Sequence, residues 1–443
     1  MILTFPKGGV HPPDNKLSAG SPIQVLPVPG TVTIPLSQHL GAPAEPLVKK
    51  GDSVITGQLI AKGCGFISAN IHSSVTGTVA RIDRLPDSSG YRRLMVVINT
   101  GKDDWQEGID TSPRIIKNIT ATGGEIIKKT LAAGIVGLGG AAFPSHVKLS
   151  VPKGKKADIL IINGVECEPC LTSDHRLMLE KGEEMIIGIQ LIMKALDVKK
   201  AVIGIENNKP DAIKHLNSIL KEYEGVTVQP LKVKYPQGAE KQLIKAVTGR
   251  EVPSGKLPIE TGAVVHNVGT AFAIYEAIQK NKPLIERVIT VTGKNVANPS
   301  NFLVRIGTPV ASLIEAAGGV PEDTGKVVNG GPMMGKALNS LDIPVTKGTS
   351  GILLIPESES SRRPAENCIR CARCVSICPM GLEPYLLSAA SENKKWEMVE
   401  SEHVLDCMEC GSCSYICPSA RPLLDYIRLG KSTVSHIIRA RKQ

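Results

Sequence analysis

The chain has 443 residues, of which 42% are hydrophobic and only 3% aromatic, and its formal charge is +10. A chain of this length is expected to form about three domains, with cores built from aliphatic side chains. No run of about 18 consecutive apolar residues occurs, which excludes a membrane-spanning helix. Residues 1–10 lack the apolar core of a secretory signal, and the dispersed cations argue against nucleic-acid binding. We therefore expect a soluble cytoplasmic protein.

The N-terminal part of the chain predicts a small β domain. Residues 26–100 contain short β-prone runs separated by Gly and Pro. Residues 46–61 and 71–79 resemble the two halves of the barrel-sandwich hybrid domain of lipoyl and biotinyl carriers. The carrier lysine of that family has no clear counterpart between them, so we expect an unmodified structural module. This N-terminal extension and barrel-sandwich domain is predicted to occupy residues 1–110.

The next region predicts an α/β domain over residues 111–286. Buried strands alternate with amphipathic helices, which is typical of a parallel sheet covered on both faces. The polar residues Asn163, Glu206 and Tyr235 each end a predicted strand, at the sheet edge where α/β domains bind ligands. The strands are predicted at 158–163, 201–206 and 226–235, and the helices at 124–133, 176–196, 211–223 and 239–247.

Beyond this region the pattern returns to short strands around one helix, predicted at 310–317. Residues 356–365 are rich in Ser, Glu, Arg and Pro and predict a linker. A helix is predicted at 385–400, between two cysteine-rich runs. The last part of the chain, residues 357–443, is therefore expected to be a mostly helical cluster-binding domain.

Eight of the eleven cysteines form two near-copies of one pattern. Three Cys at steps of three, then a fourth Cys followed by Pro, is typical of bacterial ferredoxins with two [4Fe–4S] clusters, in which the fourth Cys binds the neighbouring cluster. A zinc module is the alternative, but it does not explain the third Cys or the repeated Pro. Such clusters carry one electron at a time. The pattern predicts Cys368, Cys371, Cys374 and Cys417 on one cluster, and Cys407, Cys410, Cys413 and Cys378 on the other.

A glycine loop at residues 137–144, followed by Lys148, is the second strong signal. Close glycines let the backbone approach a ligand, and free N–H groups can cradle phosphate. A tight packing turn would explain the glycines equally well. The dinucleotide fingerprint is absent, because no strand directly precedes the loop.

The loop resembles the flavin loop of the NADH-binding 51-kDa subunit of respiratory complex I. Residues 163–169, 235–240 and 267–270 resemble three further motifs of that family, in the same order. The chain departs from those motifs at Leu138, Val165 and Ala239. The resemblance implies that Phe143 lies near the nicotinamide, with Glu166, Glu168 and Glu240 close by. It implies FMN binding by Gly137, Gly139, Gly140, Lys148, Asn163, Tyr235, Gly238, Asn267 and Thr270.

The whole arrangement resembles the RnfC family of peripheral NADH-binding subunits of Rnf ion-translocating ferredoxin:NAD oxidoreductases. Residues 5–13 and the Gly-rich segment 330–335 carry this resemblance together with the features above. It implies a multidomain α/β protein with a Rossmann-like FMN/NADH domain and a soluble-ligand-binding β-grasp (SLBB) domain at 287–356. It also implies two [4Fe–4S] clusters, FMN, NAD(H) as substrate and membrane and peripheral subunits as partners, with ferredoxin acting indirectly. The expected location is the cytoplasmic face of the cell membrane.

Several alternatives stay open at this point. A soluble flavin and iron–sulfur cobalamin reductase would share the same parts, and a non-enzymatic scaffold with a ferredoxin tail belongs to another class. The direction of electron flow and the coupling ion are not determined. Cys167 and Cys170 are expected to be reduced thiols rather than a redox disulfide. The basic residues near the C-terminus predict either a solvated tail or a surface for an acidic protein or an anionic membrane; they are Arg428, Lys431, Arg439, Arg441 and Lys442.

Overall fold

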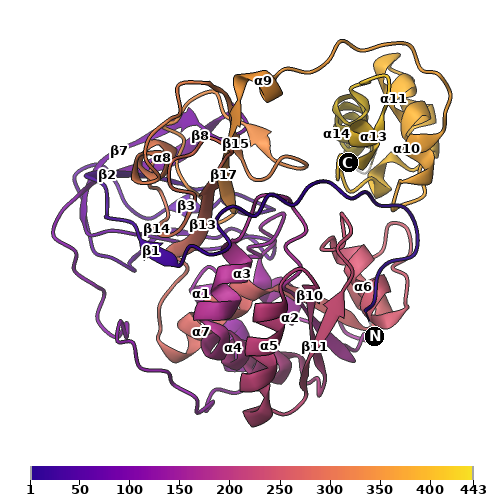
Figure 1. The fold of residues 1–443 in the computed structure, drawn as a ribbon. Coiled ribbons are helices and arrows are strands. Elements are labelled where there is room, and N and C mark those ends of the chain that lie inside the picture. The colour runs from indigo at the N-terminus through magenta and orange to yellow at the C-terminus, as the bar shows by residue number, and fades with distance from the viewer. Residues whose placement is uncertain (1, 442–443) are drawn as a thin grey trace.

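The computed structural model describes residues 2–441 and shows the expected multidomain arrangement (Figure 1); Lys442 lies outside the described residues. The barrel-sandwich region has two antiparallel sheets, in the orders β2-β8-β7-β4 and β3-β5-β6. Aliphatic side chains from both sheets form its core, including Ile34, Ile60 and Ile98. The strands are β2 (Thr31–Pro35), β3 (Glu45–Pro46), β4 (Ser53–Val54), β5 (Leu59–Lys62), β6 (Ile71–His72), β7 (Gly77–Pro86) and β8 (Arg92–Thr100).

The central region contains the predicted parallel sheet. Its order is β11-β10-β9-β12, and every neighbouring pair is parallel. The strands are β9 (Ile159–Asn163), β10 (Ala201–Glu206), β11 (Val226–Leu231) and β12 (Ala263–Asn267). The helices are α1 (Gly123–Ala132), α2 (Ser145–Leu149), α3 (Ser173–Glu180), α4 (Gly182–Leu196), α5 (Pro210–Ile219), α6 (Glu240–Thr248) and α7 (Val268–Gln279).

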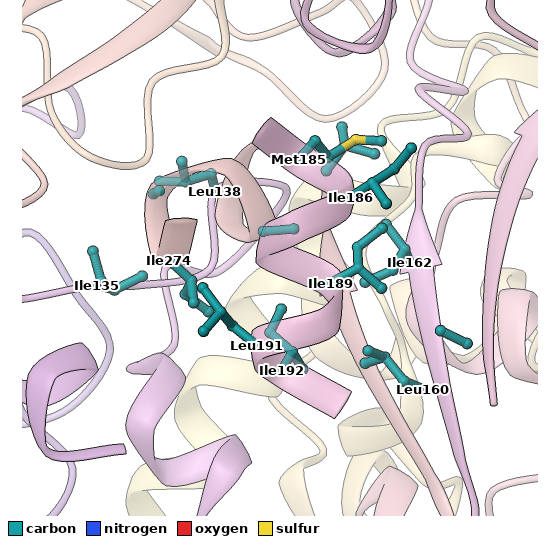
Figure 2. Packing of buried hydrophobic residues seen from close by; sticks show 14 of the residues in the cluster. Ile135, Leu138, Leu160, Ile162, Met185, Ile186, Ile189, Leu191, Ile192 and Ile274 are labelled. Carbon is teal, nitrogen blue, oxygen red and sulfur yellow. The ribbon is translucent and has the colours of Figure 1, made fainter. Parts of the chain in front are cut away.

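The side chains of β9 alternate between two hydrophobic cores, which shows that both faces of this sheet are covered. Leu160 and Ile162 belong to the largest core, together with residues of α4 and α7 (Figure 2). Ile161 points to the opposite face and belongs to a second core, with Leu243 and Ile244 of α6. A strand with apolar residues on both faces is what a buried parallel sheet requires.

Two predicted helices are each divided in the structure, so those two predictions were wrong. The helix expected at 176–196 is interrupted at Lys181, where α3 ends and α4 begins. A Cβ on Gly182 would lie 3.1 Å from side-chain atoms of α5, so the chain turns where α5 packs closely. The helix expected at 385–400 is interrupted before Trp396, because Lys394 adopts a left-handed conformation (φ 55°).

The third sheet is mixed and draws in a strand from the N-terminal segment. Its order is β1-β14-β13-β17-β15-β16, with β1 (Ile23–Val25) pairing parallel to β14 (Ser300–Arg305). The N-terminal extension therefore contributes to a sheet remote from it in sequence. The other elements are β13 (Glu286–Thr292), α8 (Val310–Ala316), β15 (Thr324–Asn329), β16 (Lys336–Ala337), β17 (Gly351–Pro356) and α9 (Glu357–Ser360), the last lying within the predicted linker.

The C-terminal region is helical, as expected. Its longest helix, α14 (Leu423–Ala440), buries Leu423, Ile427 and Val434 against the other helices. Arg428, Lys431 and Arg439 are thus part of a packed helix rather than of a free tail. The shorter helices are α10 (Arg373–Ser376), α11 (Pro384–Glu392), α12 (Trp396–Ser401) and α13 (Ser412–Ile416). Over residues 2–441, we find no helix with the length and apolar character needed to cross a bilayer.

Residues 3–16, which we call the N-terminal strap, join the central and C-terminal regions. Figure 1 shows this indigo segment passing between the helices of the cluster domain and the central sheet. Leu3 forms a bridge to Leu231 at the end of β11, and Val10 forms one to Tyr235. The N–H of Gly9 donates to the carbonyl of Ile377 in the cluster domain at 2.8 Å. The strap thus ties the carboxyl edge of the sheet to the cysteine-rich region.

Candidate functional site

The carboxyl ends of β9 and β12 meet at a pair of asparagines. Asn163 ends β9 and lies in register with Asn267, which ends β12. Nδ2 of Asn163 donates to the carbonyl of Gly238 at 2.7 Å. Oδ1 of Asn267 caps α7 by accepting from the N–H of Gly269 at 2.8 Å. Three of the predicted cofactor-binding residues are therefore adjacent.

The glycine loop lies against the same edge. A Cβ on Gly139 would lie 2.8 Å from Nδ2 of Asn267, so this close approach requires glycine. Gly140 has nothing within 4 Å of its Cβ position and is open to a ligand. Oγ1 of Thr270 accepts from the N–H of Leu138 at 2.9 Å, so this predicted ligand also holds the loop in place. Leu138, where the complex I family has Arg, is buried in the core (Figure 2).

The base of the loop is closed by Gly137 and Phe143. The N–H of Gly137 donates to the carbonyl of Phe143 at 2.9 Å. The Phe143 side chain is half-buried at this position. Helix α2 begins directly afterwards and carries Lys148 toward the ends of β12 and α6.

Lys148 lies in a polar group that includes an unpartnered imidazole. Its Nζ donates to Oε1 of Glu240 at 2.6 Å and to the carbonyl of Val265 at 3.0 Å. His266 is buried, and its Nε2 has no hydrogen-bond partner among the described residues. Burial, with the nearby Lys148, lowers the pKa of His266 to about 3, so the ring is neutral at pH 7. An ammonium, two amides and a free imidazole nitrogen beside bare glycines fit the phosphate and polar ring edge of a flavin mononucleotide.

The three predicted acidic residues do not converge on one point. The carboxylate of Glu166 accepts from the N–H groups of Asp174 and His175 at 2.8 and 3.2 Å, at the start of α3. Oε1 of Glu168 accepts from the N–H groups of Met333 and Met334 at 2.6 and 3.0 Å. Glu168 therefore anchors the Gly-rich segment 330–335, while Glu240 pairs with Lys148.

Asp174 is a site residue that sequence reasoning missed. Its Oδ2 accepts from Nδ2 of Asn267 at 2.6 Å. Burial, with the neighbouring Glu166 carboxylate, raises the pKa of Asp174 to about 7. The only signal in the sequence is its place six residues after Glu168, at the start of a predicted helix, which is where acidic residues commonly occur for structural reasons.

Lys16 of the strap was also missed, because it acts across a long sequence separation. Its Nζ donates to the carbonyls of Glu166, Glu168 and Leu171 at 2.9, 2.9 and 2.6 Å. One ammonium thus satisfies three backbone acceptors of the acidic loop. Cys167 and Cys170 in this loop are free thiols, and Sγ of Cys167 accepts from the N–H of Gly238 at 3.2 Å.

Four cysteines surround a cavity in the C-terminal region. The cavity is lined by Cys378 of the first run and by Cys407, Cys410 and Cys413 of the second, together with apolar side chains such as Met380 and Leu424. Burial raises the pKa of Cys407 to about 11 and that of Cys413 to about 12. Within residues 2–441 no three Cys, His, Asp or Glu side chains are grouped tightly enough for a single metal ion. Four thiols around one mostly apolar cavity are a donor set that suits one cubane cluster, with Cys378 beside the three cysteines of the second run.

The remaining four cysteines lie nearer the surface. Cys368 and Cys371 are exposed, and Cys374 and Cys417 are half-buried. The Cys417 thiol is close enough to Cys374 to contribute to its raised pKa, although burial is the main cause. Cys417 of the second run thus lies near Cys374 of the first run, which is compatible with the predicted crossover. We call this group the outer cluster site and the cavity the inner cluster site.

The inner cluster site touches the loop that follows β11. The prediction that Tyr235 ends this strand was wrong, because β11 ends at Leu231 and Tyr235 lies in the loop beyond it. The Tyr235 hydroxyl donates to the carbonyl of Cys410 at 2.7 Å, and Tyr235 is only 3% exposed. Val10 of the strap packs in the same apolar cluster, as do Cys167 and Met333. A predicted flavin-binding residue and a predicted cluster ligand are therefore in direct contact.

Comparison with protein families assigns each region of the chain. Residues 3–103 match the RnfC barrel sandwich hybrid domain, residues 131–276 the Nuo51 FMN-binding domain, residues 288–337 the SLBB domain, and residues 367–420 the 4Fe-4S dicluster domain. The chain is 49% identical to one subunit of the proton-translocating ferredoxin:NAD(+) oxidoreductase complex of Clostridium ljungdahlii, over 98% of this chain and 94% of that protein. The chain belongs to the RnfC family.

A second relative supports this assignment, and one solved structure shares the fold. The corresponding subunit of the Na(+)-translocating complex of Acetobacterium woodii is 46% identical, over 97% of this chain and 96% of that protein. An NAD+-reducing [NiFe]-hydrogenase chain is 18% identical with a TM-score of 0.51, covering 74% of this chain and 65% of that one, which shows a shared fold. The two RnfC relatives carry different coupling ions in their names. Family membership therefore does not identify the ion, but it favours a complex subunit over a cobalamin reductase or a scaffold.

Proposed function

We propose that this RnfC protein is the subunit through which an ion-translocating ferredoxin:NAD(+) oxidoreductase complex exchanges electrons with NAD(H). Electrons pass between the nicotinamide, FMN and two [4Fe–4S] clusters, and then to other subunits. The observation that supports the proposal is the contact between Tyr235 and Cys410, because it joins a predicted flavin-binding residue to a predicted cluster ligand.

FMN, when bound, would supply the conversion between a two-electron hydride transfer and one-electron steps. Lys148 and the N–H groups of the glycine loop would hold its phosphate. Asn163, Asn267 and the free Nε2 of His266 would fix polar groups of the ring system. Phe143 would pack beside the nicotinamide, as its homology position implies.

The acidic residues shape the site rather than react. Glu240 orients Lys148, Glu166 fixes the start of α3, and Glu168 holds residues 333–334 beside the inner cluster site. Asp174, whose pKa is raised to about 7, would hold or release a proton near Asn267. These roles keep the flavin edge ordered and its surroundings dry.

The chain would act at the cytoplasmic face of the membrane, as a peripheral subunit. Eight cluster-binding cysteines and a free Cys167–Cys170 pair suit a reducing compartment. Fractionation of cells tests this location. We expect the chain in the membrane fraction of lysed cells, and we expect salt or loss of the other subunits to release it. Recovery of the chain in the soluble fraction, with the other subunits present and without added salt, would contradict this location.

Anaerobic titration of the purified, cofactor-loaded chain with NADH tests the activity. We expect loss of the oxidised flavin absorbance, an electron paramagnetic resonance signal from reduced clusters, and ferricyanide reduction in a diaphorase assay. A flavin-loaded chain that NADH does not reduce and that has no diaphorase activity would reject the proposal. A chain that binds no flavin would instead favour the scaffold alternative.

A further inference from the structure

The segment around the outer cluster site is unusually open. All thirteen residues from 361 to 373 are exposed, including Cys368 and Cys371. Figure 1 shows the segment leaving α9 as an extended loop around the outer side of the cluster domain. The inner cluster site differs, because Cys378, Cys410 and Cys413 are buried. The outer cluster site is thus the part of the relay that a separate protein can approach.

This segment is strongly cationic. It contains Arg362, Arg363, Arg370 and Arg373 and a single acidic residue, Glu366. Arg362 pairs with Asp425. The other three arginines make no ion pair within residues 2–441. Their charge is therefore available to an incoming partner, and fixed charge of one sign speeds the approach of the opposite sign.

Of the described cations near the C-terminus, only Arg439 is without an ion pair and adds to this free charge. Arg428 and Lys431 both pair with Glu409, at 3.2 and 3.0 Å, and Arg441 pairs with Glu400 at 2.9 Å. Nζ of Lys431 also donates to the carbonyl of Cys407 at 2.6 Å. These residues stabilise the cluster domain internally. The expectation of a basic docking surface therefore moves from the C-terminal residues to the segment 361–373.

Exposed apolar and aromatic side chains accompany the arginines. Ile369 is 67% exposed, and Tyr385 and Tyr415 are 43% and 48% exposed. Tyr385 lies beside Cys374, and Tyr415 lies on α13, which packs against α10. Tyrosine and arginine are enriched in protein interfaces, whereas lysine is depleted. Every cation of this segment is an arginine, although lysines outnumber arginines in the chain as a whole.

We propose that residues 361–373, with Tyr385 and Tyr415, form a docking face for an acidic iron–sulfur electron-carrier protein or domain. Carboxylates of the carrier pair with Arg363, Arg370 and Arg373 while its apolar contact surface covers Ile369. This docking places the carrier next to the outer cluster site. The proposal rests on the proposed function and specifies the chemistry of the partner.

Binding of a strongly acidic two-cluster ferredoxin to the cluster-loaded chain tests this face. Both proteins are kept oxidised, so that neither NADH nor flavin reduction affects the result, and the Kd is measured by calorimetry at low and high salt. We expect Arg363→Glu/Arg373→Glu to weaken binding by about tenfold or more at low salt. The difference from the wild-type chain should shrink as salt screens the charges.

The matched control reverses two exposed arginines on the barrel-sandwich domain, Arg81→Glu/Arg84→Glu, and should bind like the wild-type chain. Iron content and the cluster signals confirm that both variants are loaded. Equal weakening in both variants, or wild-type binding that is absent or insensitive to salt, would overturn the proposal. Anionic lipid vesicles form a second arm. If the Arg363/Arg373 variant loses vesicle binding but retains ferredoxin binding, the face belongs to the membrane and the proposal fails.

Discussion

The Tyr235 hydroxyl donates a 2.7 Å hydrogen bond to the carbonyl of Cys410, across 175 positions of sequence. The bond joins the loop that follows β11, at the carboxyl edge of the parallel sheet, to the inner cluster site. The inner cluster site is therefore not remote from the sheet edge that we propose for the flavin, although its place at the end of the chain suggests otherwise.

Tyr235→Phe should make the reduction potential of the inner cluster more negative. The hydroxyl donates to the backbone carbonyl of Cys410, a predicted cluster ligand, and its loss leaves the negative end of that carbonyl dipole unneutralised beside the cluster, which disfavours the reduced, more negative state. Potentiometric titration followed by electron paramagnetic resonance measures this change, and the outer cluster serves as an internal reference. Tyr275→Phe removes another buried tyrosine hydroxyl, bonded to the N–H of Ile116, and should leave both potentials unchanged. Equal shifts in the two variants would show that Tyr235 has no specific effect.

Cys378→Ser should remove the inner cluster although Cys378 belongs to the first cysteine run. Its side chain lines the cavity with Cys407, Cys410 and Cys413. Iron content should fall by about half, since each cubane holds half of the iron. Cys417→Ser should remove the outer cluster instead. If Cys378→Ser abolished the signal that Cys374→Ser also abolishes, the crossover assignment would be wrong.

Lys148→Met should weaken FMN binding by about tenfold or more, because it removes a charge-assisted contact near the glycine loop. Glu240→Gln should leave binding unchanged or strengthen it, since it releases Lys148 from a 2.6 Å ion pair. Quenching of flavin fluorescence gives both affinities. A similar loss of FMN affinity in both variants would indicate that the Lys148–Glu240 pair acts structurally instead.

Lys16→Met should loosen the acidic loop, because three carbonyls lose one charged donor. The free energy of unfolding should fall by about 2 kcal/mol or more, and proteolytic cleavage should increase near residues 166–171. Thermal melting and limited proteolysis measure these effects. Lys49→Met, an exposed position in the barrel-sandwich domain, is the matched control and should behave like the wild-type chain.

The stability of the protein should increase with pH above neutrality because of Lys347. This lysine is 1% exposed, and its Nζ donates to the carbonyls of Asn70 and Gly134 at 2.8 and 2.7 Å. Burial lowers its pKa from 10.5 to about 7. Between these pH values the unfolded chain binds more protons than the folded chain, so the free energy of unfolding rises with pH. A pKa shift of this size corresponds to a rise of a few kcal/mol at most, roughly.

The Lys347→Met variant isolates this effect. The melting temperature of the wild type relative to that of the variant should be higher at pH 9.5 than at pH 7, as measured by circular dichroism. The neighbouring His72 has its pKa lowered to about 3 by burial and by Lys347, so it does not titrate in this range. A difference that is the same at both pH values would contradict the prediction.

Local patterns in the sequence determined much of this protein. The spacing of the eight cysteines predicted two clusters, and alternation of apolar runs predicted the parallel sheet with Asn163 at its carboxyl edge. Such features depend on residues close together in the chain. Apolar periodicity also predicted one helix where the structure has α3 and α4, divided at Lys181. Periodicity contains no information about the neighbouring helix that packs against Gly182.

Only the tertiary structure decided how these parts meet. The contacts of Lys16 with the acidic loop, of Glu168 with residues 333–334, and of Tyr235 with Cys410 each join segments more than a hundred residues apart. Each is a hydrogen bond to a backbone group, which every residue offers, so no side-chain pattern identifies the partner. The sequence specified the cofactor-binding motifs, and folding set which cluster lies beside the flavin edge and which faces solvent.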